Sequence, residues 1–261
     1  MSAEDEVMGG VTDEVAADAR EAAAAYRAAR EVPREGLGAW REALAAEAGL
    51  RPGMTVLDVG AGTGGFAAAF REWFGVDVLA VEPDAAMRAL IPAGDGVTAL
   101  AGRAEALPVG DGCADAAWFG SVVHHIGDLA AAAREARRVL RPGAPVLVRN
   151  VFPGRGARDL RLRFFPETAD AIAGYPTVED VTAAFATAGF RRTALHALPQ
   201  ESAPTLAAYA DGLRRGTDSK LRSLSDAAYA RGLARLRAAA AADPGERAVS
   251  WLDLLVLRAD G

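Results

Sequence analysis

A glycine-rich segment flanked by two acidic residues is the part of this sequence best suited to bind a ligand. Asp58 precedes the run Gly60-Ala61-Gly62-Thr63-Gly64-Gly65, and Glu82 follows it. A strand that leads into glycines and then a helix lets a polar ligand approach the backbone, because glycine lacks a side chain and the helix offers free N–H groups. Gly60, Gly62 and Gly65 also satisfy the G-x-G-x-x-G dinucleotide pattern, with Glu82 where a ribose-binding acid belongs.

Two classes of cofactor therefore compete for this segment. The pattern alone allows an NAD-linked oxidoreductase. However, the carboxylate of Asp58 would repel a pyrophosphate, whereas it suits a ligand that carries ammonium and sulfonium groups, such as S-adenosylmethionine (SAM). Helical sequence occupies the chain before the first expected strand, whereas dinucleotide enzymes more often begin near that strand. These features favour SAM and leave NAD as the alternative.

Other side chains could serve an acceptor molecule. His124 or His125 could take a proton from a phenol, an amine or an acidic carbon, or could instead only cap a helix or pack beside the cofactor. A pocket for an anionic or aromatic acceptor is predicted from Arg149, Arg161, Phe152, Phe164 and Phe165, although the arginines could equally form a solvated face.

A metal site is not expected. Asp111, Cys113 and Asp115 would alternate along a strand, and only one of them is a soft ligand.

Alternating strands and helices must position these residues. Short apolar strands between amphipathic helices predict an α/β fold with a doubly wound, Rossmann-like sheet and a helical cap over its carboxyl edge. The seven expected strands are Met54–Val59, Val76–Val81, Val97–Leu100, Ala114–Phe119, Ala144–Val151, Phe190–Leu198 and Ser250–Arg258.

The domain organisation follows from the same pattern. We expect an N-terminal helical cap segment at residues 1–49 and a core at 50–198, which contains a substrate-loop insertion at 153–176. A helical cap insertion at 199–249 and a last core strand at 250–261 complete the chain. Long segments outside the alternation usually form lids or pockets.

Composition limits the partners. The 261 residues carry a net charge of −6, which argues against a nucleic-acid partner. Cys113 is the single cysteine, and neither a signal peptide nor a membrane-spanning run is visible. We expect a cytoplasmic monomer or homodimer.

Five motifs in order resemble the class I SAM-dependent methyltransferases, especially the small-molecule branch that includes the quinone-biosynthesis C-methyltransferases. They are Val56–Gly64, Ala80–Asp84, Gly102–Pro108, Asp115–Ile126 and Arg138–Gly143. The resemblance implies SAM as cofactor, S-adenosylhomocysteine as product, and a small-molecule acceptor methylated on O, N or C in secondary or cofactor metabolism. A SAM-binding protein that guides a cyclisation or rearrangement remains an alternative.

The resemblance also assigns residues to parts of SAM. The methionine part of SAM would be lined by Gly60, Ala61 and Gly62, and its amino group would be oriented by Asp58. Glu82 would accept the ribose hydroxyls. The adenine would pack against Pro83 and Met87. Ala104 and Glu105 would address the adenine ring, beside Arg103, where many relatives carry an aspartate. The sulfur would lie near Phe119, Gly120 and Ser121. A helix that folds over the cofactor would carry Tyr26 and Arg30. Glu82→Ala is expected to weaken SAM binding while leaving the melting temperature of the cofactor-free protein nearly unchanged.

Overall fold

The computed structural model describes residues 20–25 and 34–259. Its strands are β1 Thr55–Val59, β2 Asp77–Val81, β3 Val97–Leu100, β4 Ala116–Gly120, β5 Pro145–Asn150, β6 Phe190–Ala203 and β7 Ala248–Ala259. Its α-helices are α2 Gly38–Ala48, α3 Gly65–Phe74, α4 Ala85–Arg88, α5 Leu129–Val139, α6 Leu160–Phe164, α7 Ala169–Ala173, α8 Val178–Ala186, α9 Leu206–Gly212, α10 Ser219–Arg222 and α11 Asp226–Ala242. The 3-10 helices are η1 Arg34–Leu37, η2 Val123–His125, η3 Pro166–Thr168 and η4 Arg215–Thr217.

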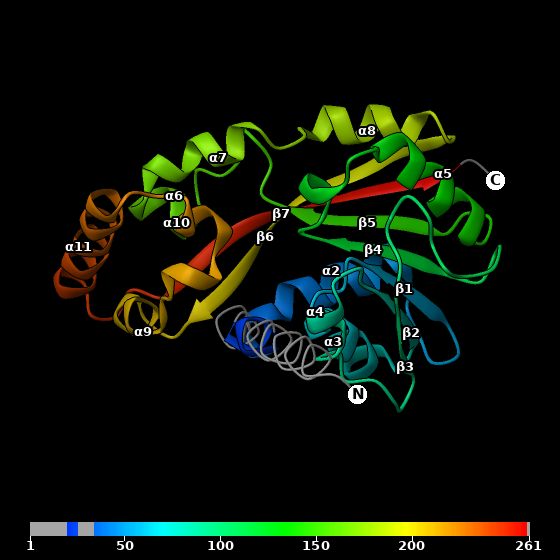
Figure 1. Cartoon of the computed structure of the whole chain (residues 1–261), viewed down its shortest axis with the longest axis horizontal. Helices are drawn as coiled ribbons and strands as arrows, with labels where there is room; N and C mark the ends of the chain where they lie inside the picture. Colours follow the sequence, from blue (N-terminus) through cyan, green and yellow to red (C-terminus); the bar gives the residue numbers. More distant parts are fainter. Residues whose placement is uncertain (1–19, 26–33, 260–261) are drawn as a thin grey trace, which may run out of the picture.

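Within the described residues, the seven strands form one sheet with the order β3-β2-β1-β4-β5-β7-β6 (Figure 1). The first five strands are parallel, and β7 runs antiparallel to both β5 and β6. Val59 pairs with both Val81 and Phe119, so β1, β2 and β4 end at the same level. The residues that follow these strands therefore meet at one edge, where ligands of open α/β sheets bind. The predicted α/β fold is confirmed.

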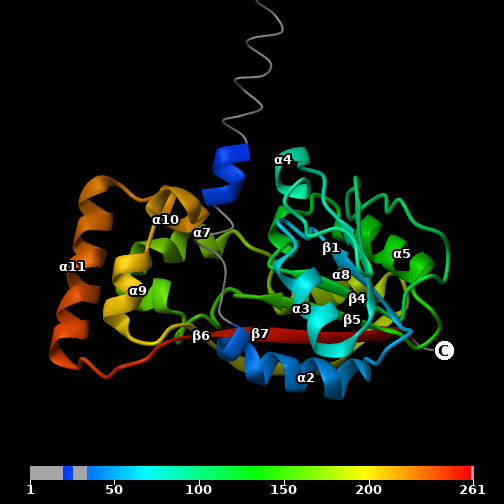
Figure 2. The same ribbon diagram turned by 90° about the horizontal axis from the view of Figure 1, so that it is seen from below.

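Helices cover both faces of the sheet (Figures 1 and 2). Buried side chains of α5 and α8 pack on one face, and those of α2 and α3 pack on the other. Trp40 and Leu44 of α2 are fully buried there, with Trp40 edge-on to Trp118 at 6.3 Å between ring centroids. The prediction that residues 1–49 form a cap is thus wrong for α2, because its apolar side chains complete the core beneath the sheet.

Helices α4 and α8 begin at residues whose side chains cap them. The side chain of Asp84 accepts the N–H of Met87 at 2.8 Å and caps α4. Thr177 and Asp180 form a reciprocal capping box at the start of α8. Both caps satisfy N–H groups that the first turn leaves unpaired.

The cap is built from two separate insertions. Strands β6 and β7 extend beyond the core, and α9, α10 and α11 connect them at the far end (Figure 2). A hydrophobic cluster joins these helices to α6, which belongs to the insertion after β5. The predicted boundaries at 198/199 and 249/250 are therefore too close to the core, since β6 runs to Ala203 and β7 begins at Ala248.

The described part of the N-terminal segment, residues 20–25, is helical. It lies between the cap and the α3–α4 side of the core (Figures 1 and 2). These residues fall within the N-terminal segment 1–49 that is expected to be helical.

Candidate functional site

The glycine loop between β1 and α3 is fixed to the end of β2. The N–H groups of Gly60 and Ala61 donate to the carbonyl of Val81 at 2.9 and 3.1 Å. Gly60 and Gly62 adopt φ values of 68° and 58°, which L side chains rarely adopt. A Cβ on Gly60 would lie 2.3 Å from Cγ2 of Val122, whereas a Cβ on Gly62 would meet nothing within 4 Å. The space beside the backbone of Gly62 is therefore open to a ligand.

Glu82 joins the glycine loop to the segment that follows β2. Its side chain is buried, and its Oε2 accepts the N–H of Gly62 at 2.8 Å while Oε1 accepts that of Asp84 at 3.0 Å. Each carboxylate oxygen has further lone-pair capacity, so two ribose hydroxyls can donate to the same group. The loop and a bound ribose would thus share one acid.

Asp58 is a buried acid directly before the loop. It is 2% exposed, and its Oδ2 has no hydrogen-bond partner in the part of the chain that the structure describes. Burial, with a further contribution from nearby Glu82, raises the pKa of Asp58 to about 7, and a hydrogen bond from the backbone N–H of Ala67 partly opposes this. A buried carboxylate with an open oxygen favours a cationic ligand such as an ammonium group. These residues fit the ribose and the amino group of SAM.

The raised pKa of Asp58 predicts a stability profile. Between about pH 4 and pH 7 the folded cofactor-free protein holds a proton on Asp58 that the unfolded chain has lost, so the free energy of unfolding falls as pH rises through this window. Asp58→Asn should remove this slope. The free energy of unfolding of Asp58→Asn minus that of wild type should therefore be larger at pH 8 than at pH 4. We expect an increase of roughly 2–4 kcal/mol, because one pKa unit corresponds to about 1.4 kcal/mol.

Urea unfolding of both proteins at these two pH values measures this difference. Equal slopes in wild type and Asp58→Asn would show that Asp58 ionises as an ordinary surface acid.

The residues predicted to contact adenine lie after β2 and β3. Pro83 is exposed and Met87 half-buried on α4, whereas Ala104 is buried. Arg103 is exposed and lies 3.8 Å from the carboxylate of Glu105. Glu105 also accepts the N–H of Gly127 at 3.1 Å. Their contacts with adenine remain predictions.

The end of β4 carries backbone strain. Ser121 has a φ of 57°, and Asp95 is the other non-glycine residue with a positive φ in the described chain. Such strain persists where the surrounding structure imposes it, often at functional sites. Gly120 precedes Ser121 at the end of β4, whereas the side chain of Phe119 packs on Phe185 at 5.8 Å. Only the backbone of Phe119 is therefore placed to face a cofactor.

The two histidines follow in η2. Their ring centroids are 4.1 Å apart, and the ring of His124 stacks on Tyr175 at 4.0 Å with an interplanar angle of 10°. His125 is exposed and His124 half-buried. The sequence did not identify Tyr175, which comes from the segment between α7 and α8. The role of a histidine as general base remains a prediction.

The predicted acceptor pocket does not form from the phenylalanines. Phe152 is fully buried in the core. Phe164 and Phe165 are buried in the cap, where Phe165 stacks on Tyr229 at 5.7 Å. Phe164 and Phe165 were expected to line an acceptor pocket, but they pack among the cap helices instead.

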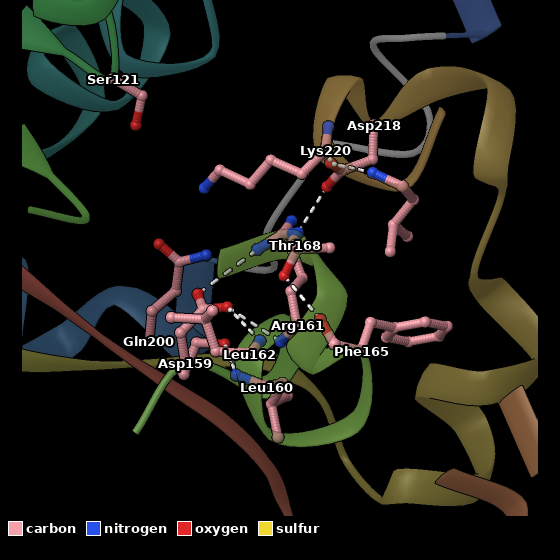
Figure 3. A network of polar contacts seen from close by, with 12 residues as sticks. Ser121, Asp159, Leu160, Arg161, Leu162, Phe165, Thr168, Gln200, Asp218 and Lys220 are labelled. Carbon is pink, nitrogen blue, oxygen red and sulfur yellow. Dashed lines mark hydrogen bonds and ion pairs between the residues drawn. The ribbon is translucent and has the colours of Figure 1, made fainter. Parts of the chain in front are cut away.

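Arg161 is also engaged inside the cap. It forms ion pairs with Asp218 and, at 3.7 Å, with Asp159 (Figure 3). Among the predicted acceptor residues, Arg149 alone lies beside the end of β4, where it donates to Oγ of Ser121 at 2.7 Å.

The remaining expectations concern the N-terminal helix, a metal site and a membrane-spanning segment. Tyr26 and Arg30 lie outside the described residues. Within residues 20–25 and 34–259, no cluster of three potential metal ligands is found. In the same ranges, no helix combines the length and apolar character needed to cross a membrane.

Known proteins share both the central segment and the fold. A family model described as a methyltransferase domain matches residues 57–148. A demethylmenaquinone methyltransferase of Roseiflexus castenholzii is 40% identical over 112 residues, which cover 41% of this chain and 47% of that protein. The chain thus spans about half the length of the curated relatives it matches. These matches confirm the resemblance to class I SAM-dependent methyltransferases for the segment they cover.

Solved structures extend the likeness to the fold of most of the chain. A putative methyltransferase from an antibiotic biosynthesis pathway of Anabaena variabilis superposes with a TM-score of 0.62 and 19% identity, over 84% of this chain and 96% of that one. The [4+2]-cyclase SpnF superposes with a TM-score of 0.56 and 19% identity, over 85% and 80%. At this identity the likeness shows the fold alone.

Proposed function

We propose that this protein is a SAM-dependent methyltransferase that moves a methyl group to an O, N or C atom of a small molecule and releases S-adenosylhomocysteine. The observation that carries the proposal is the buried carboxylate of Glu82, held by the N–H groups of Gly62 and Asp84 at the end of β2. The Oδ2 of nearby Asp58 supports it, since this atom has no hydrogen-bond partner among residues 20–25 and 34–259 and can receive the amino group of SAM. The matched methyltransferase segment contains all four residues.

Each element of the site would have a distinct role in the transfer. When bound, SAM supplies a methyl group made electrophilic by its sulfonium. Glu82 and Asp58 orient the ribose and the amino group, and the backbone of Gly62 lies against the methionine part. Most of the rate enhancement then comes from alignment and exclusion of water at the end of β4. His124, three residues after Ser121, can accept a proton that the acceptor loses.

We also propose that the protein is a cytoplasmic monomer or homodimer that acts on a small molecule. The net charge of −6 argues against a nucleic-acid substrate, and the single cysteine fits a reducing compartment.

Transfer of a labelled methyl group tests the proposed reaction. The protein is incubated with methyl-labelled SAM and a panel of phenols, amines and carbon acids, and both S-adenosylhomocysteine and labelled products are measured. We expect one class of acceptor to gain label in equal amount to the S-adenosylhomocysteine formed, and Glu82→Ala to form neither. Conversion of an acceptor to an unlabelled cyclised or rearranged product, with SAM intact, would contradict methyl transfer.

A further inference from the structure

A small polar cavity lies where the segment after β5 meets the β6–β7 hairpin. We call it the β5–β7 cavity. Its volume is about 170 Å³, and its lining includes Arg155, Arg158, Ala197, Trp251 and Asp253. Pockets for drug-sized ligands measure roughly 300–1,000 Å³, so this cavity suits one chemical group of a small molecule rather than a whole cofactor.

The β7 side chains of the cavity lie on the sheet face opposite Arg149. The guanidinium of Arg149 is 5.3 Å from the ring centroid of Trp40, in the cluster that packs on the α2 and α3 face. Asp253 shares its face of β7 with Leu255, because alternate side chains of a strand point the same way. Leu255 belongs to the cluster on the α5 and α8 face. No described residue assigned to SAM lines the cavity, which is therefore a separate place in the fold.

A buried ion pair forms one side of the cavity. Asp253 is 4% exposed, and its carboxylate accepts from Nε and Nη2 of Arg155 at 2.8 and 2.9 Å. This two-point contact offsets the charge of Arg155 and attaches the segment after β5 to β7. Glu179 is a further acid that acts on Arg155, but it is exposed and pairs with Arg192 at 3.9 Å.

Arg158 is held by Trp251 at both its backbone and its side chain. Its carbonyl accepts the N–H of Trp251 at 3.1 Å, and its guanidinium carbon lies 3.6 Å from the ring centroid of Trp251. No side chain within residues 20–25 and 34–259 forms an ion pair with this guanidinium, although Arg158 is exposed. Stacking occupies the face of a guanidinium, whereas its five N–H groups point outward in its plane. Arg158 therefore presents donors in a fixed orientation.

We infer that the β5–β7 cavity binds the carboxylate or phosphate group of a small molecule, with Arg158 as the main donor. The paired N–H groups of a guanidinium match two oxygens of either anion. Because Trp251 already orders the Arg158 side chain, a ligand bears less of the entropic cost of fixing it. A bound anion would connect the segment after β5 to the β6–β7 hairpin. This binding does not depend on the proposed methyl transfer.

Nuclear magnetic resonance of the tryptophan indole N–H groups tests the inference. Trp251 is one of four tryptophans and lines the cavity, and Trp251→Phe identifies its signal by loss. The full chain is titrated with acetate and, separately, with inorganic phosphate, at an ionic strength kept constant with sodium chloride. We expect a saturable shift of the Trp251 signal while the other three indole signals stay in place. The anion that binds more tightly identifies the group.

Replacement of Arg158 tests its role as the donor. Arg158→Gln should weaken binding of the preferred anion by about tenfold or more, because the substitution removes charge-assisted hydrogen bonds. Arg237→Gln is the matched control, since Arg237 is an exposed arginine of α11 outside the cavity. It should bind the anion like wild type.

Three results would overturn the inference. The first is a Trp251 signal of the wild-type protein that shifts with neither anion. The second is an equal shift of all four indole signals, which would indicate a general effect of the salt. The third is unchanged affinity in Arg158→Gln, or an equal loss in Arg237→Gln. If Arg158→Gln fails to fold, the first two results still decide, because they require only the wild-type protein and the signal assignment.

Discussion

Glu82→Ala should abolish measurable SAM binding and also destabilise the cofactor-free protein. The substitution removes the acid that would accept both ribose hydroxyls, and hydrogen bonds to a charged group contribute about 1.5–3 kcal/mol each, so affinity should fall by about a hundredfold or more. It also leaves the N–H groups of Gly62 and Asp84 without their acceptor. An unsatisfied buried donor costs about 1–3 kcal/mol, so the free energy of unfolding should fall by a similar amount.

Calorimetry with S-adenosylhomocysteine and urea unfolding measure the two effects separately. Glu179→Ala provides the matched control, because Glu179 is an exposed acid on α8. If Glu82→Ala binds S-adenosylhomocysteine normally but is less stable, Glu82 only stabilises the glycine loop and does not bind the ribose. From the sequence alone we expect a nearly unchanged melting temperature, whereas the hydrogen bonds that Glu82 accepts in the structure predict a lower one.

Gly60→Ala and Gly62→Ala should differ sharply although both glycines have positive φ. At Gly60 the added Cβ meets Val122 at 2.3 Å, and overpacking combined with backbone strain should lower stability by about 2–4 kcal/mol. At Gly62 the Cβ meets nothing, so only the strain of about 1–2 kcal/mol applies. However, this methyl group would occupy space that the proposed cofactor needs. Gly62→Ala should therefore remain folded and lose SAM affinity by at least about tenfold.

Thermal unfolding and calorimetry of the two variants measure these outcomes. A Gly62→Ala protein with wild-type affinity for S-adenosylhomocysteine would place the cofactor away from the loop.

Features encoded by short stretches of sequence were predictable. The strand before Gly60 depends on neighbouring residues, and the expected strand Met54–Val59 matches β1 apart from its first residue. The juxtaposition of Gly62 and Glu82 also follows from sequence, because parallel strands of a β-α-β unit end at one edge. The ends of β6 and β7 were not predictable, since their outer parts pair only with each other. Local periodicity carries no information about such a distant partner.

The residues on the acceptor side of the site were also hard to predict, because their neighbours are distant in the sequence. Phe165 was expected to line an acceptor pocket because its segment alone offers nothing to cover it, but helices inserted much later in the chain pack against it. Tyr175 lies in that part of the fold too, and no motif marks it. The α2 helix was misplaced because an alanine-rich amphipathic helix fits a cap and a sheet face equally well. Only the packing of Trp40 against Trp118 decides between them.

A calorimetric titration of the wild-type protein with S-adenosylhomocysteine and, separately, with NAD⁺ tests which cofactor the glycine loop binds. We expect one S-adenosylhomocysteine bound per chain, with affinity that rises between pH 6 and pH 8 as Asp58 loses its proton, and no detectable heat with NAD⁺. Tight binding of NAD⁺ without binding of S-adenosylhomocysteine would contradict this expectation, and would assign the glycine loop and Glu82 to a dinucleotide.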